Sequence, residues 1–192
     1  SLSSCKKEDN NSGSGQISFE LTDAPIDDAN IQGVFVTVAD LKVDGASVGN
    51  FGSKQTINLM AYQNGQVKSL ANGQFSTGTH ANIQLVLDQA QDANGASPGC
   101  YVLTKDGVKH ALQTSANATS NISVTGNPIS VTENATTTAV LDFDLRKAIQ
   151  YSSSGASSGY KFVSDTELNT AVRVVAKSQS GKIIGKCSDL SG

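Results

Sequence analysis

Residues 16–21 read Gln-Ile-Ser-Phe-Glu-Leu, a strict alternation of polar and apolar side chains. Successive side chains of a β-strand point to opposite faces of a sheet, so this pattern predicts a strand that buries Ile17, Phe19 and Leu21. Every second residue of 34–38 is a valine, which predicts a second strand of the same kind. The fold is therefore expected to be built from strands.

Short apolar runs of this type recur along the chain, separated by turn-forming pairs. Asp44-Gly45 and Asp106-Gly107 are typical of tight hairpins. We expect about ten short strands and at most one or two short helical turns, over Leu59–Tyr62 and over Leu145–Ile149 with Asp144 as N-cap. This combination favours an all-β fold, an antiparallel β-sandwich of the immunoglobulin or transthyretin kind.

The composition limits the classes of function. The 192 residues are 38% hydrophobic and 16% charged, which predicts a single sandwich domain over residues 16–192. The formal net charge of −3 comes without a basic stripe, so nucleic acid is not an expected partner. No run of 18 apolar residues is present to span a bilayer.

The first residues carry a membrane-anchoring signal. Leu2-Ser3-Ser4-Cys5 resembles the lipobox of bacterial lipoproteins, in which a signal peptide is cut before the cysteine and its sulfur receives a diacylglycerol. The resemblance implies that Cys5 is the lipidated mature N-terminus and that the protein contacts a membrane through this anchor. The alternative is an ordinary N-terminus that happens to carry a cysteine.

A polar segment follows the cysteine. Residues 6–15 contain no apolar side chain, so residues 1–15 are expected to form a lipobox remnant and a disordered tether. The run Lys6-Lys7-Glu8-Asp9 resembles the tag of some surface-exported outer-membrane lipoproteins. We therefore expect an outer-membrane lipoprotein on the cell surface, with a periplasm-facing location as the alternative.

Two further cysteines, Cys100 and Cys187, form an even pair in a chain that the lipobox places outside the cytoplasm. Disulfides persist in such compartments, so a bridge between them is a candidate. Two free buried thiols are the alternative.

Five segments, in the same order, resemble the bacterial and archaeal family catalogued as domain of unknown function 4382. The resemblance covers roughly Gly15 to Lys177 and departs at His80, where a tyrosine is expected. It implies an extracytoplasmic protein, often a lipoprotein, with no established activity, cofactor or catalytic residue. The segments are Leu21-Thr22-Asp23-Ala24-Pro25, Ile57-Asn58-Leu59-Met60, Gly78-Thr79-His80, Val140-Leu141-Asp142-Phe143-Asp144-Leu145 and Ala171-Val172-Arg173-Val174-Val175.

Paired carboxylates offer one candidate site. Asp142 and Asp144 are two apart on a predicted strand and so share one face. Together with Asp23 they could ligate calcium as a cofactor, or they could serve as acid and base in glycoside hydrolysis. The alternatives are a solvated strand face, with Asp144 capping a helical turn, and a structural turn in which Asp23 bonds backbone N–H groups two residues on.

Tyrosines offer a second candidate. The chain has no tryptophan, so a sugar-binding platform would use tyrosine rings, and Tyr151 and Tyr160 flank the Ser/Gly-rich segment 152–159. Packing in the core or at its rim is the alternative. His80 and His110 have no Cys, His or Glu at ligand spacing beside them, so zinc is not expected.

The hypothesis from the sequence is a membrane-anchored extracytoplasmic lipoprotein with a non-catalytic β-sandwich domain for binding or adhesion, whose ligand is a glycan or a protein. One alternative is a structural subunit of a surface assembly, in which a strand edge pairs with a partner chain. The other is a glycan-active hydrolase that uses Asp142 or Asp144.

Overall fold

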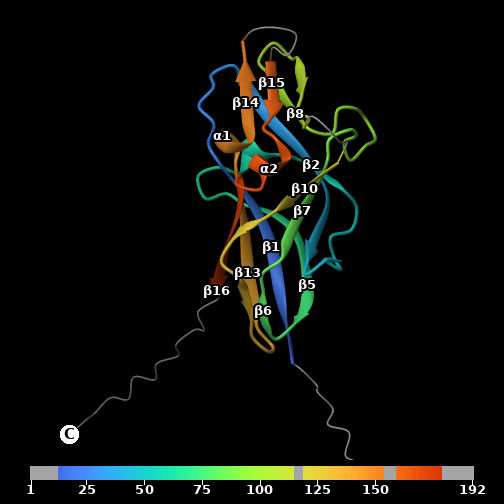
Figure 1. The fold of residues 1–192 in the computed structure, drawn as a ribbon, viewed down its shortest axis with the longest axis vertical. Coiled ribbons are helices and arrows are strands. Elements are labelled where there is room, and N and C mark those ends of the chain that lie inside the picture. Colours follow the sequence, from blue (N-terminus) through green and yellow to red (C-terminus); the bar gives the residue numbers. More distant parts are fainter. Residues whose placement is uncertain (1–12, 115–118, 154–158, 179–192) are drawn as a thin grey trace, which may run out of the picture.

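The computed structural model describes residues 13–114, 119–153 and 159–178, which form two packed sheets with a hairpin at one end (Figure 1). The predicted all-β sandwich is confirmed. The described residues hold sixteen strands rather than about ten. The difference arises because five of these strands have only two or three residues; the shortest are β3 (Ala46–Ser47) and β11 (Thr125–Gly126).

The first sheet has the strand order β11-β16-β13-β1-β5. Ile17, Phe19 and Leu21 of β1 are fully buried, as the alternation predicted. Two of its four strand pairs, β13 with β16 and β1 with β5, are antiparallel. β11 runs parallel to β16, and β1 runs parallel to β13, with Leu21 beside Leu141. The sequence did not predict the parallel pairing of β1 with β13. Parallel neighbours need a long connection, and here the strands of the second sheet lie between β1 and β13 along the chain. The bounds are β1 (Ser14–Ala24), β5 (Lys68–Ser76), β13 (Thr136–Asp144) and β16 (Val172–Ser178).

The second sheet has the order β10-β7-β2-β8-β9, and β3 and β4 also pair with β2. Val34, Val36 and Val38 of β2 are fully buried, as predicted. The Asp44-Gly45 turn has the two positive φ angles, 51° and 86°, that a tight hairpin requires. The bounds are β2 (Ile31–Val43), β4 (Gln55–Asn58), β7 (Ile83–Asp88), β8 (Tyr101–Thr104), β9 (Lys109–Ala111) and β10 (Thr119–Ser123).

Two small sheets complete the strands. β6 (Gly78–His80) pairs with β12 (Ile129–Val131), and β14 (Ile149–Ser152) pairs with β15 (Gly159–Phe162). β1 starts at the lower end of Figure 1 and the β14–β15 hairpin forms the upper end. The chain therefore enters the described fold at the end opposite this hairpin.

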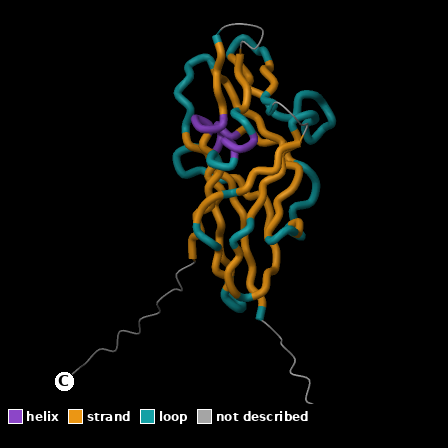
Figure 2. Tube along the Cα trace, viewed as in Figure 1, coloured by secondary structure: helices purple, strands orange, loops and turns teal. Residues whose placement is uncertain are grey.

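Three short helices lie between the sandwich and the hairpin (Figure 2). The predicted turns are confirmed as η1 (Leu59–Tyr62), a 3₁₀ turn, and α1 (Leu145–Ala148), which Asp144 caps. The third, α2 (Asp165–Leu168), was not predicted. Ser164 and Glu167 form its capping box, a signal that the sequence does carry.

One hydrophobic core lies between the two sheets. Its largest fully buried side chains include Phe19 and Phe143 from the first sheet and Leu41 and Leu85 from the second. β10 pairs with β7 of the second sheet, and β11, two residues further on, pairs with β16 of the first. The chain thus crosses between the sheets along one side of the sandwich.

Candidate functional site

Three segments that are far apart in the sequence meet at the hairpin end of the molecule. They are the β1–β2 loop, the β8–β9 hairpin and the β14–β15 hairpin, and they enclose a pocket of about 540 Å³. We call this the tip pocket. Its lining residues are Asn30, Thr104, Lys105, Asp106, His110, Tyr151, Gly159 and Tyr160.

A row of three rings borders the tip pocket. Tyr151 and Tyr160 are a cross-strand pair of the hairpin, with ring centroids 4.9 Å apart and planes tilted by 50°. The Tyr160 ring also meets His110 edge-on, with centroids 5.5 Å apart. Tyr160 is half-buried inside this row, whereas Tyr151 is 62% exposed and presents its ring to solvent.

The β1–β2 loop holds Tyr160 in place. Its hydroxyl donates a hydrogen bond of 2.7 Å to Oδ2 of Asp28, whose Oδ1 accepts from the backbone N–H of Asn30. Burial, together with the Asp28 carboxylate, raises the pKa of Tyr160 to about 12. Tyr160 is therefore a neutral donor fixed at both its ring and its hydroxyl.

A second hydrogen-bonded chain crosses the β8–β9 hairpin. The Thr104 hydroxyl donates to Oδ1 of Asp106 at 2.5 Å, and Nε2 of His110 lies 3.2 Å from the same Oγ1. Hydrogen bonds from Thr104 and from the Val108 backbone N–H lower the pKa of Asp106, so this carboxyl is ionised at neutral pH. A hydroxyl has one proton and Thr104 directs it to a carboxylate, so we assign the His110 proton to Nε2, which leaves Nδ1 as an acceptor.

The tip pocket thus combines an aromatic face with a polar border. Lys105 and Asp106 contribute opposite charges, and Asn30 contributes a neutral amide. Such a site fits a ligand with a flat apolar face and several polar groups around its edge.

The paired carboxylates lie elsewhere, on the outer face of β13. Oδ1 of Asp144 accepts from the N–H of Arg146 at 3.1 Å to cap α1, and also faces its Nε at 3.3 Å. Oδ2 of Asp142 faces Nη2 of Arg173 at 4.0 Å. Both carboxylates border a separate pocket of about 310 Å³ that Lys147 also lines, so cations neutralise this site.

Asp23 lies on the neighbouring strand β1, beside Phe143, so its side chain is on the opposite face of the sheet from Asp142 and Asp144. It continues the inward series of β1 and is 5% exposed, so it lies inside the sandwich rather than in a turn. The backbone bond two residues on, expected for Asp23, is instead made by Asp28 to Asn30. The described residues contain no group of three His, Cys, Asp or Glu arranged to hold a metal ion, so the structure does not bring the candidate calcium ligands Asp23, Asp142 and Asp144 together.

A family model described as Domain of unknown function (DUF4382) matches residues 14–164, well over half of the chain. The chain belongs to this family. The resemblance predicted from five segments is thus confirmed for the family, although the match ends before the fifth segment, Ala171–Val175. No curated protein and no solved structure matches the chain.

In this DUF4382 domain, sequence reasoning found the two tyrosines but missed the rest of the tip pocket. Asp28 lies 132 residues from Tyr160, and no local pattern connects the two. The Asp106-Gly107 hairpin was predicted as a turn, and the structure confirms it between β8 and β9. Its neighbours Thr104 and His110 carry no sequence signal for the site.

The cysteine predictions lie partly outside the described residues. Cys100 lies just before β8 and is fully buried, and it has no disulfide partner among the described residues. Its Sγ is 3.5 Å from the backbone N of Thr37, and burial raises the pKa of the thiol to about 12. Cys5 and Cys187 lie outside the described residues, as does most of the predicted tether. The lipid anchor and the disulfide therefore stay predictions.

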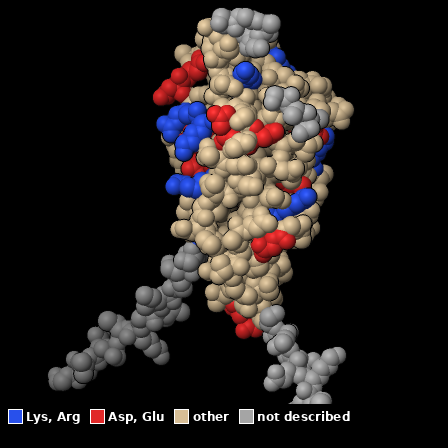
Figure 3. Space-filling model, viewed as in Figure 1, with Lys and Arg blue, Asp and Glu red and all other residues tan. Residues whose placement is uncertain are grey.

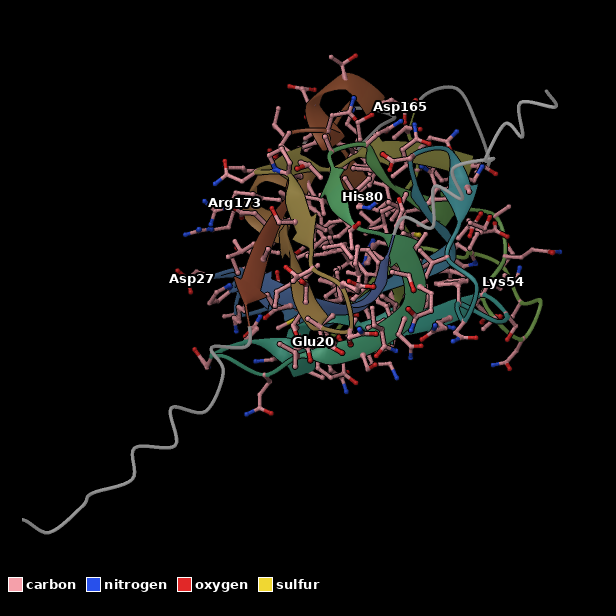
Figure 4. The ribbon with its side chains drawn as sticks, turned by 90° about the horizontal axis from the view of Figure 1, so that it is seen from below. Glu20, Asp27, Lys54, His80, Asp165 and Arg173 are labelled. Atoms are coloured by element: carbon pink, nitrogen blue, oxygen red, sulfur yellow. The ribbon has the colours of Figure 1, made fainter. Side chains whose placement is uncertain are left out.

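Charges of both signs are interspersed over the DUF4382 domain (Figure 3). Seen from below, Glu20, Asp27, Lys54, Asp165 and Arg173 lie around the rim, whereas His80 lies inside the outline (Figure 4). No helix in the described part of the chain is long and apolar enough to cross a membrane.

Proposed function

We propose that the protein is a membrane-anchored extracytoplasmic lipoprotein whose DUF4382 domain is a non-catalytic binding or adhesion module, and that the tip pocket is its ligand site. One observation carries the proposal. The tip pocket has an exposed aromatic ring and a polar border. The β14–β15 hairpin that helps to form it lies at the end of the molecule opposite the start of β1 (Figure 1).

The position of the pocket suits an anchored protein. Cys5 precedes Gly13 by eight residues, a distance of at most about 28 Å in a fully extended chain. Lipid on Cys5 would hold the lower end of the sandwich near the membrane. The tip pocket would then face away from the membrane, toward a ligand in solution or on another surface.

The carboxylates favour binding over hydrolysis. Glycoside hydrolysis uses two carboxyl groups on either side of the scissile bond. Among the described residues that line the tip pocket, Asp106 is the single carboxylate. Asp142 and Asp144 face Arg173 and Arg146, and Asp144 also caps a helix.

The anchor is tested by feeding an alkyne-tagged fatty acid to bacteria that express the full-length gene. We expect label on the wild type and on Cys187→Ser, the matched control, and none on Cys5→Ser. Label that persists in Cys5→Ser would contradict the anchor. Protease added to intact cells then separates the surface location, in which the chain is cut, from the periplasm-facing one.

The binding site is tested with the purified chain on arrays of glycans and of extracellular proteins. We expect at least one ligand class to be bound, and binding to be lost in Tyr151→Ala but kept in Val67→Ala, which truncates another exposed apolar side chain. Binding that Tyr151→Ala leaves unchanged would place the ligand site elsewhere.

A structural subunit of a surface assembly is a second candidate, favoured by the edge of β16. Only Arg173 and Val174 pair with β11, so within the described residues the same edge lacks a neighbouring strand from Val175 onward. Val175 is 43% exposed there. Open edges of this kind accept a further strand. Self-association of the full chain in sedimentation experiments, abolished by Val175→Lys, would support this candidate, and a monomer would count against it.

A further inference from the structure

We infer that the tip pocket binds a neutral saccharide, with one pyranose ring stacked on Tyr151. This inference rests on the proposed function, because it names the ligand class of the same site. It is carried by the ring row, by the hydrogen bonds that fix its polar border, and by the balance of charge around it.

Tyr151 provides the stacking surface. Tyr151 is 62% exposed, and its ring contacts the tilted ring of Tyr160, which Asp28 and His110 contact in turn. The C–H face of a pyranose is flat and apolar, and its hydrogens complement the negative face of an aromatic ring. A ring that is already held in place loses little conformational entropy when a sugar stacks on it.

Polar groups around the pocket match sugar hydroxyls. Oδ1 of Asp106 accepts from Thr104 and from the Val108 N–H, whereas Oδ2 accepts no hydrogen bond from the described residues. This ionised oxygen is a strong acceptor for a hydroxyl. Nδ1 of His110 is a second acceptor, and the amide of Asn30 and the ammonium of Lys105 are donors. Donors and acceptors are thus both present, as a hydroxyl-rich ligand requires.

The charge balance favours a neutral sugar. The charged side chains of the lining are Lys105 and Asp106, one of each sign. A carboxylated or sulfated sugar would be attracted by Lys105 but repelled by Asp106 in the same pocket. A neutral sugar can form hydrogen bonds with both side chains. The volume of about 540 Å³ lies in the range of small-molecule sites and has room for one or two pyranose rings.

The test uses the full chain on an array of neutral, uronate-containing and sialylated glycans, followed by calorimetric titration of the strongest hit. A mucin and the same mucin stripped of its glycans serve as protein probes. We expect binding to neutral glycans and to intact mucin. Tyr151→Ala should weaken the affinity at least tenfold, Tyr151→Phe should keep it within about threefold because the ring remains, and Asp106→Asn should weaken it through the lost carboxylate.

The outcomes separate the inference from the proposed function. Preference for anionic glycans, or equal binding of stripped mucin, combined with loss in Tyr151→Ala, would overturn the saccharide inference and leave the binding module standing. No binding to any probe, or binding that Tyr151→Ala leaves unchanged, would overturn both. Far-UV circular dichroism and melting temperatures confirm that each variant is folded.

Discussion

Gln63 donates a hydrogen bond of 3.0 Å from Nε2 to Oδ2 of Asp23, whereas Oδ1 of the same buried carboxyl has no partner among the described residues. Burial raises the pKa of Asp23 to about 7, and the nearby charges of Asp142 and Asp144 act in the same direction. The Gln63 hydrogen bond and the Leu145 backbone N–H lower the pKa, although this N–H falls short of hydrogen-bond geometry. A carboxyl in this environment is more stable protonated than ionised.

We expect stability to fall as Asp23 ionises. The unfolded carboxyl has a pKa near 3.9, so the folded state binds one more proton between about pH 4 and pH 7. The stabilising contribution is complete below pH 4 and is lost as the pH rises through 7, up to roughly 4 kcal/mol. Asp23→Asn should match the wild type at pH 4 and exceed it at pH 8 in urea unfolding. The exposed control Asp27→Asn should not, and equal stability of Asp23→Asn and wild type at pH 8 would contradict the argument.

Tyr160→Phe should destabilise the domain by about 1 to 2 kcal/mol, because it leaves Oδ2 of Asp28 without its donor. Tyr151→Phe is the matched control, since that hydroxyl makes no hydrogen bond to a described residue, and the stability of this variant should stay within about 0.5 kcal/mol of the wild type. Chemical denaturation of the two variants side by side gives both values. Equal effects would mean that the Asp28 contact contributes nothing.

The pKa of His80 should depend on the carboxylate of Asp44. Burial lowers the pKa of His80, but the Ser76 carbonyl at 2.9 Å and the Asp44 carboxylate at 2.6 Å outweigh it, so the pKa is raised above 6.5. Protonated His80 therefore stabilises the folded state. This contribution is complete below the pKa that His80 has in the unfolded chain, and it is lost as the pH rises through the pKa that His80 has in the folded protein. Asp44→Asn should lower the His80 pKa in an NMR titration, and an unchanged His80 pKa would contradict the argument. Asn tolerates the φ of 51° at this turn, so the backbone should be preserved.

Loss of the α2 capping box should cost stability. Ser164→Ala removes the hydroxyl that accepts from the Glu167 N–H at 3.3 Å, for which we expect about 1 kcal/mol. Ser164→Thr keeps an oxygen at this position and should lose much less. Melting curves of both variants test this, and a Ser164→Ala protein as stable as the wild type would show that α2 is held by packing of Leu168 alone.

Cys100 should not react with a thiol reagent in the folded protein, because it is fully buried and its pKa is about 12. Unfolding without reductant then tests the predicted bridge in the same sample. A bridged Cys100 stays unreactive until reductant is added, whereas a free thiol reacts at once. Peptide mapping by mass spectrometry assigns the label to Cys100 or Cys187.

Local patterns predicted the local features of this fold. The alternation in β1, the hairpin at Asp44-Gly45 and the cap at Asp144 each depend on residues that are close in sequence, and each is confirmed. The inward Asp23 could have been read from the same alternation, since it is the next odd residue after Leu21, but its turn-like neighbour Pro25 favoured a loop.

The tip pocket could be predicted only in part because it depends on pairing between distant segments. Tyr151 and Tyr160 stand out by residue type, whereas Asp28, Thr104 and His110 gain their roles from the way three loops converge. The parallel pairing of β1 with β13 was missed for the same reason, since no local pattern encodes the direction of a partner more than one hundred residues away.

That parallel pair sets the order in which the domain can form. Gln16 is 120 residues from its partner Thr136, and β1 is an inner strand of its sheet. As the chain leaves the ribosome, one side of β1 can find β5 early, but the other stays open until almost the whole domain has been synthesised. Pairings of such high contact order slow folding. The domain should therefore fold late and as a unit, and the open edge of β1 should stay unpaired until most of the chain has been synthesised.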